Sequence, residues 1–295
     1  MSRFLENDEQ FIMLPKNDFA FKMLFGDERN KDILIAFLNS VLNEKIEHIS
    51  LLNTELKREF IEDKHGILDV RAVTDKGINI DIEIQLLKTK YMPERTLYYW
   101  SKMYIEQLKS GDKFSKLKKT ITINILDYKS INSEKFHNCF HLLEDDSGLK
   151  LTDAIEVHFL EMPKLHERKD LDVNDNLIQW MMFLDSETKE GFDVLAGKNK
   201  EIEKAYNILQ VISKDDEARA IYLAREMALH DEVTRLEEAE EKGIEKGLEK
   251  GRQESQMNIA KNLLNIGIDE ESIAKATGLS EDVIKKIKQE ISTIE

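Results

Sequence analysis

The chain has 295 residues, 41% of them hydrophobic and 34% charged, and a formal net charge of −15 at pH 7, which suits one substantial domain with an appended segment. The acidic excess argues against a protein that coats nucleic acid nonspecifically, but it permits a local basic surface. The single cysteine, Cys139, predicts neither a disulfide framework nor a cysteine-based zinc site, and the lack of a signal peptide or a run of roughly 20 apolar residues predicts a cytoplasmic protein outside the membrane.

Hydrophobic periodicity predicts an α/β core in the first half of the chain. Apolar residues at helical spacing indicate two N-terminal helices, and Asn17 or Asp18 can cap the first of them. Pro93 is expected in the first turn of a later helix. The expected helices are residues 17–25, 30–44 and 93–108, and the expected strands are residues 46–55, 69–73, 78–87, 120–126 and 154–162.

One of these strands has acidic residues along one face. Residues 80–86 alternate between apolar and polar, so that Asp81, Glu83 and Gln85 share one side of the strand. The Asp-Lys-Gly turn that precedes the strand predicts a hairpin, which would bring Asp69 beside them. Converging carboxylates suit a hard divalent cation. An edge strand with a solvated polar face explains the same pattern without a metal.

A basic stretch follows the acidic strand. Residues 88–119 contain nine basic and three acidic residues. An acidic pocket beside a basic surface suits a phosphodiester substrate, whereas a solvated helix face with ordinary lysines accounts for the same composition. We consider Arg95, Tyr98 and Lys102 candidates for contacts to DNA. For Tyr98, amphipathic packing is the alternative interpretation.

Several segments resemble a known family. Asp69, followed by Glu83, Ile84 and Gln85, resembles the PD-(D/E)XK nuclease signature, with Gln85 in place of the usual Lys. Taken with four further segments in the same order and spacing, the chain resembles the bacterial Rpn family of recombination-promoting nucleases, which are also described as transposases. The resemblance covers most of the chain, and the four segments are residues 17–26, 95–100, 158–165 and 241–251.

The resemblance implies a PD-(D/E)XK core, in which a mixed sheet is flanked by helices. It also implies a Mg²⁺- or Mn²⁺-dependent DNA endonuclease that acts in DNA recombination, mobile-element or defence biology. Asp69, Glu83 and the backbone carbonyl of Ile84 would bind the metal. Gln85 cannot carry a charge, so it can only position water or phosphate by hydrogen bonds. Asp18 corresponds to an acid of the family's first helix, an additional metal or water ligand, although a simple helix N-cap explains it equally well.

Other polar residues give no clear site. Asp81 lies roughly 7 Å from Glu83 along the strand, and we expect it to be solvated or to act only through the metal's ligands. The seven histidines are scattered, and His158 and Glu161 would lie on opposite faces of a strand. We therefore expect no histidine-based metal cluster. The chain also lacks a Walker loop, GxGxxG and GxSxG, which leaves nucleotide-binding and serine-hydrolase functions without support.

From residue 172 onward the pattern is helical, over residues 172–185, 199–213 and 215–253. Residues 231–254 carry nine acidic and five basic residues, and glycines recur every fourth residue from 243 to 251. We interpret this run as a solvated connector, with helix–helix contact in an oligomer as the alternative. Residues 257–290 are expected to form three short helices, with a helix-turn-helix pattern around Gly278.

The C-terminal helices suit DNA recognition and protein interaction about equally. Residues 257–295 carry seven acidic residues and five lysines, a poor balance for phosphate contacts, although Lys285, Lys286 and Lys288 cluster. The competing function is therefore a catalytically weak or inactive nuclease-fold module that binds DNA or protein, or forms a homo-oligomer, through these helices. The expected segments are a nuclease-like core at 1–165, a helical extension packed on it at 166–230, a charged helical connector at 231–256 and a three-helix tail at 257–295.

Overall fold

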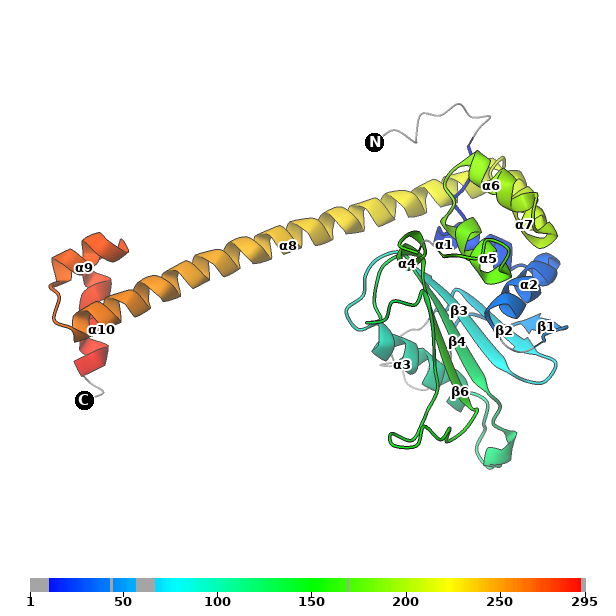
Figure 1. Cartoon of the computed structure of the whole chain (residues 1–295), viewed down its shortest axis with the longest axis horizontal. Coiled ribbons are helices and arrows are strands. Elements are labelled where there is room, and N and C mark those ends of the chain that lie inside the picture. The colour runs from blue at the N-terminus through cyan, green and yellow to red at the C-terminus, as the bar shows by residue number, and fades with distance from the viewer. Residues whose placement is uncertain (1–10, 43–44, 57–66, 169, 293–295) are drawn as a thin grey trace. The chain divides into compact units, whose positions relative to one another are not determined.

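A computed structural model describes residues 11–42, 45–56, 67–168 and 170–292 (Figure 1). The chain divides into two compact units, residues 1–228 and 229–295. The first unit contains a six-stranded mixed sheet with helices packed on it, and the second is helical. The predicted fold class, a mixed sheet flanked by helices with a helical C-terminal extension, is confirmed.

The sheet combines antiparallel edges with a parallel centre. Its strand order is β1-β2-β3-β4-β6-β5. The first three strands pair antiparallel, β3, β4 and β6 pair parallel, and β5 returns antiparallel beside β6. The strands are β1 (Ile49–Leu51), β2 (Val70–Thr74), β3 (Asn79–Gln85), β4 (Thr120–Leu126), β5 (His137–Phe140) and β6 (Ile155–Glu161).

Both faces of β3 are buried, but their chemistry differs. Ile80, Ile82 and Ile84 pack into the main core with the N-terminal helices α1 (Asp18–Phe25) and α2 (Lys31–Val41). The other face presents Asp81 and Glu83, only 1% and 2% exposed. β3 lies between β2 and β4, so the alternative of an edge strand with a solvated polar face is wrong.

The helix α3 (Met92–Ile105) covers the acidic face of the sheet. On that face Asn124 of β4 is paired with Glu83 of β3, and the hydroxyl of Thr96 in α3 lies 3.0 Å from Oδ1 of Asn124. The next residue of α3 that points inward is the buried Tyr99. Helix α3 therefore closes over the acids, while α1 and α2 cover the opposite face.

The remaining helices of the first unit pack on the same core as α1 and α2. Trp180 and Phe183 of α5 and Tyr206 of α7 are buried there. The buried residues of these helices belong to the same cluster as those of the strands, so the extension and the sheet share one hydrophobic core. These helices are α4 (Met162–His166), α5 (Asn176–Asp185), α6 (Lys189–Ala196), α7 (Lys200–Ile212) and the start of α8 (Asp216–Asn265).

The structure differs from the sequence-based elements at β1, α4, β5, α6 and the end of α8. Strand β5 and helices α4 and α6 were not expected. His137–Phe140 shows no clear hydrophobic period, whereas α6 is a short amphipathic helix that buries Phe192 and Leu195. The first strand is only three residues long where we expected residues 46–55. The first tail helix is not separate, since residues 257–265 are the end of α8.

In the second unit, the last part of α8 packs against α9 (Glu270–Thr277) and α10 (Glu281–Ser292). Its small core consists of Ala260, Ile273, Ile284 and Ile287. Gly278 ends α9 with φ of +74°, a left-handed conformation that an L side chain rarely adopts. The expected helix-turn-helix arrangement around Gly278 is present.

Candidate active site

The β2–β3 hairpin brings Asp69 and Glu83 together, as the sequence predicted. The register pairs Val70 with Ile82, which places Asp69 opposite Glu83 at the end of β2. The backbone N–H of Asp69 donates to Oε1 of Glu83 at 3.0 Å, and the backbone N–H of Ile84 donates to Oδ2 of Asp69 at 3.0 Å. Ile84 therefore contributes its backbone N–H group to the site, as a hydrogen-bond donor to Asp69. That its carbonyl binds a metal remains a prediction.

Gln85 and Arg95 both contact the second carboxylate oxygen of Glu83. The side-chain amide of Gln85 donates to Oε2 at 3.2 Å, and Nη2 of Arg95 lies 3.2 Å from the same atom. Arg95 is further held by Tyr99, whose ring centroid lies 5.3 Å from its guanidinium carbon. Arg95, a candidate for contact with DNA, therefore forms an ion pair with Glu83 in this structure.

Helix α1 reaches the site through Lys22, whose Nζ lies 2.9 Å from Oδ1 of Asp69. The sequence analysis assigned no role to Lys22. Asp18, one turn earlier on the same helix, has a side chain that is 38% exposed and pairs with Arg225 at 3.8 Å. Asp18 is not the helix cap, because the side chain of Asn17 accepts the N–H groups of Phe19 and Ala20.

Asp81 is buried beneath the site and is not solvated. It lies opposite Arg71 in the hairpin register, and its Oδ1 is buried without a hydrogen-bond partner among the described residues. Burial, followed by the charges of Glu83 and Asp69, holds the pKa of Asp81 well above its usual range. Of the two alternatives for Asp81, solvation is therefore wrong, since α3 covers this residue, and a role through the metal's ligands stays a prediction.

The electrostatics of the site favour a bound cation. Burial, and then the charge of Asp69, raise the pKa of Glu83 to about 7, although Arg95 acts in the opposite direction. Carboxylates packed this closely resist ionising together unless positive charge lies between them. Lys22 and Arg95 supply part of that charge from the rim of the site. Hard carboxylate oxygens from Asp69 and Glu83 are a donor set that Mg²⁺ or Mn²⁺ accepts.

Tyr98 and Lys102 lie further along α3. The ammonium of Lys102 lies 5.8 Å from the centroid of the Tyr98 ring, and the Tyr98 ring packs edge-on against Tyr99 at 5.6 Å. Both side chains are half-buried. Tyr98 and Lys102 therefore lie beside Tyr99, the residue that stacks on Arg95.

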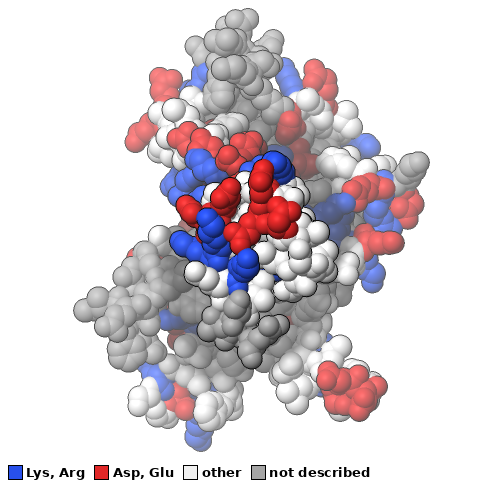
Figure 2. All heavy atoms as spheres, turned by 90° about the vertical axis from the view of Figure 1, so that its left-hand side faces the viewer, with Lys and Arg blue, Asp and Glu red and all other residues white. Residues whose placement is uncertain are grey.

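In the C-terminal unit, lysines are interspersed with acids. Lys288 of α10 pairs with Glu270 at 2.7 Å, and Lys275 of α9 pairs with Glu271 at 2.7 Å. The face of this unit turned toward the viewer in Figure 2 shows acidic and basic side chains side by side. The side of this unit seen in Figure 2 is therefore not uniformly basic, as a surface that binds DNA phosphates would be.

Two protein-family models match the chain. The model of the PD-(D/E)XK nuclease family transposase matches residues 15–239, and the model of the Rpn/YhgA-like nuclease family, C-terminal HTH domain, matches residues 253–289. The chain therefore belongs to the family of transposases with a PD-(D/E)XK nuclease domain. The predicted resemblance to Rpn nucleases is confirmed, and with it a nuclease-type function. The C-terminal match agrees with the α9–α10 geometry and suggests DNA binding.

No curated protein and no solved structure gives a significant match to the chain. Among the described residues, no helix is both long and apolar enough to span a membrane.

A second cluster of potential metal ligands lies at the edge of the sheet, where no such cluster was expected. Cys139, Glu156 and His158 offer ligand atoms that all lie within 4.8 Å of one another. This finding contradicts the expectation that a single cysteine and scattered histidines form no such group. The reason is strand β5, which was not predicted and which carries Cys139 beside β6.

Proposed function

We propose that this protein is a Mg²⁺-dependent DNA endonuclease, in which Mn²⁺ can replace Mg²⁺. The observation that carries the proposal is the interlocked pair of Asp69 and Glu83. The pair lies on the sheet face covered by α3, in a chain whose family is a nuclease family. Buried carboxylates that repel each other are costly to the fold, and binding a cation between them is the use that offsets this cost.

We assign the metal to Asp69, Glu83 and the backbone carbonyl of Ile84, with Asp18 as a candidate for an additional water or metal contact. A bound divalent cation lowers the pKa of water and neutralises charge on a scissile phosphate. Gln85 donates a hydrogen bond within the site, so it can orient a water or a phosphate oxygen but cannot accept a proton as a neutral lysine could.

In the proposed reaction, the basic side chains of Arg95 and Lys22 would also bind the phosphate of the substrate. Arg95 and Lys22 contact the acids in this state. With a cation held by Asp69 and Glu83, Arg95 and Lys22 would be free to contact phosphate oxygens, and the guanidinium group of Arg95 is well shaped for them. Tyr98 and Lys102, on the same helix as Arg95, would extend this contact along the DNA backbone.

The second candidate function is a catalytically weak or inactive module that binds DNA or protein, or pairs with a second copy, through its C-terminal helices. Two observations favour it. Gln85 replaces the usual Lys of the nuclease signature, and the C-terminal unit is a small helix-turn-helix with its own core. The two candidates differ in one property, since only the first requires metal-dependent bond cleavage.

Nicking of supercoiled plasmid by the purified full-length protein separates these functions. The endonuclease proposal expects open-circular and linear DNA with Mg²⁺ and none with EDTA. DNA that stays supercoiled with Mg²⁺ and Mn²⁺, while the protein still retards it in a gel, would support the binding module and overturn the endonuclease.

A further inference from the structure

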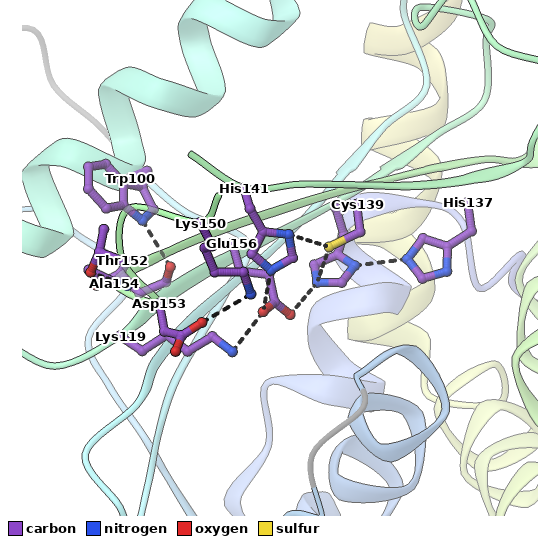
Figure 3. A network of polar contacts seen from close by, with 12 residues as sticks. Trp100, Lys119, His137, Cys139, His141, Lys150, Thr152, Asp153, Ala154 and Glu156 are labelled. Atoms are coloured by element: carbon purple, nitrogen blue, oxygen red, sulfur yellow. Dashed lines mark hydrogen bonds and ion pairs between the residues drawn. The ribbon is translucent and has the colours of Figure 1, made fainter. Parts of the chain in front are cut away.

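The edge of the sheet formed by β5 and β6 gathers five polar side chains on one face. Cys139 is paired directly with His158 in the antiparallel register. Because side chains alternate along a strand, His137 and His141 share the face of Cys139, and Glu156 shares the face of His158. Figure 3 shows His137, Cys139, His141 and Glu156 pointing toward one another.

This cluster is separate from the candidate active site. The parallel register pairs His158 with Ile123, and Ile123 with Ile82. His158 therefore lies on the isoleucine side of the sheet, whereas Glu83 lies on the side that α3 covers. A ligand site at this edge would be independent of the nuclease function.

The distances in the cluster approach those of a tetrahedral metal site. Sγ of Cys139 lies 3.7 Å from Nε2 of His158 and 3.8 Å from Nδ1 of His141. Bond lengths of about 2.3 Å for Zn–S and about 2.0 Å for Zn–N, at a tetrahedral angle, require a sulfur–nitrogen separation of roughly 3.6 Å. Oε1 of Glu156 lies 2.8 Å from Nε2 of His158, and this contact must lengthen by a few tenths of an ångström to admit the ion.

The ligand set is also supported from behind. Nδ1 of His158, the nitrogen that faces away from Cys139, lies 2.8 Å from Nε2 of His137. Oε2 of Glu156 contacts Nζ of Lys119 at 2.7 Å. Outer partners of this kind fix the ring orientation of metal-binding histidines and hold metal-binding carboxylates in place.

We propose that Cys139, Glu156 and His158 bind a Zn²⁺ ion, with His141 closing the site at its exposed rim. Thiolate and imidazole donors select zinc over Mg²⁺, which prefers oxygen donors. The ion would join the edge strand β5, through Cys139, to β6, through Glu156 and His158. His137 is a positioning residue that orients the ring of His158.

Metal content and spectroscopy of the full-length protein test this proposal. Protein purified without chelators and equilibrated with Zn²⁺ should hold one equivalent that Cys139→Ser removes. Replacement by Co²⁺ should give intense tetrahedral d–d bands together with a thiolate-to-cobalt charge-transfer band, and Cys139→Ser should abolish the latter. Cys139 is exposed, so this variant should keep its fold, which circular dichroism verifies.

Three further variants make the test specific. His158→Gln should weaken Zn²⁺ binding by more than about 100-fold. His137→Phe should weaken it roughly 10- to 100-fold while the charge-transfer band survives at saturating Co²⁺. His166→Gln alters an exposed histidine of α4 that pairs with Asp185 and should change nothing. Equal Zn²⁺ affinity in wild type and Cys139→Ser, or loss of the Zn²⁺ equivalent in Asp69→Ala, would overturn the proposal.

Discussion

The backbone N–H of Asp69 donates to the side chain of Glu83, and the backbone N–H of Ile84, next to Glu83, donates to the side chain of Asp69. Each carboxylate is thus held by the other strand of the hairpin. This reciprocal arrangement fixes the separation of the two acids before any cation binds, so the charge repulsion between them is built into the fold.

We predict that Asp69→Ala and Glu83→Ala each abolish Mg²⁺-dependent plasmid cleavage. Each variant removes one of the two carboxylates to which the metal is assigned, and neither should unfold the protein, because relief of repulsion stabilises the metal-free state. Asp75→Ala is the matched control, since it removes an exposed carboxylate from the turn of the same hairpin. Cleavage retained in either active-site variant would refute the metal assignment.

The stability of the metal-free protein should depend on the pH through Glu83. Its pKa in the folded state is about 7, above its ordinary value of 4.5, so the folded state holds the proton more tightly. The resulting stabilisation is complete below about pH 4.5 and is lost as the pH rises through 7, by about 1.4 kcal/mol for each unit of pKa difference.

Thermal unfolding in EDTA between pH 5 and pH 8 checks this dependence. Wild type should lose more stability over this range than Glu83→Gln, which cannot ionise. Addition of Mg²⁺ should restore more stability at pH 8 than at pH 5, because the ion binds the ionised carboxylate. Parallel pH curves for the two proteins would show that Glu83 does not titrate in this range.

Gln85→Lys should preserve or increase cleavage, because lysine supplies a charged donor where Gln85 now donates to Glu83. Gln85→Ala should reduce the rate, but by less than the loss of Asp69 or Glu83, since it removes a hydrogen bond and leaves the carboxylates in place. Single-turnover cleavage across a Mg²⁺ titration measures both effects. Wild-type behaviour of Gln85→Ala throughout that titration would make Gln85 a structural residue.

Arg95→Met should raise the pH at which Mg²⁺ binds. Arg95 lowers the pKa of Glu83 through its charge and hydrogen bond, so its removal leaves Glu83 protonated to higher pH and proton release must accompany metal binding. Calorimetric Mg²⁺ titrations from pH 6 to pH 9 would show the shift. Lys102→Met, on the same helix, is the control and should leave the pH dependence unchanged.

The sheet and the acidic hairpin were predictable because their signals are local. Strand β4 has the predicted bounds, Thr120–Leu126, since isoleucines and threonines alternate through it. The Asp69–Glu83 pairing followed from turn residues and a two-residue period. Both signals lie within about twenty residues of sequence.

Contacts between distant segments were not predictable in the same way. Lys22 lies in a segment that the sequence analysis quoted, but nothing in its spacing shows that α1 passes close enough for it to reach Asp69. The histidine and cysteine cluster depends on the pairing of β5 with β6. That pairing escapes a periodicity argument because β5 is a short edge strand without an apolar pattern.

If the C-terminal unit binds DNA, we expect Lys286 to contribute to the affinity. Lys286 of α10 is exposed, and among the described residues no carboxylate lies within ion-pair distance of it, whereas Lys275 of α9 pairs with Glu271. If α10 contacts DNA phosphates, Lys286→Ala should weaken binding and reduce the slope of log K against log [salt] by roughly 0.9, one released counterion. Lys275→Ala, which removes the same charge from a paired lysine, should have a smaller effect. Fluorescence anisotropy with duplex DNA at several salt concentrations measures both.

Two other results together would show that the C-terminal helices pair protomers and do not bind DNA. The first is an unchanged salt slope in Lys286→Ala. The second is a lower mass in light scattering for Ile284→Asp, a variant that disrupts the core of this unit.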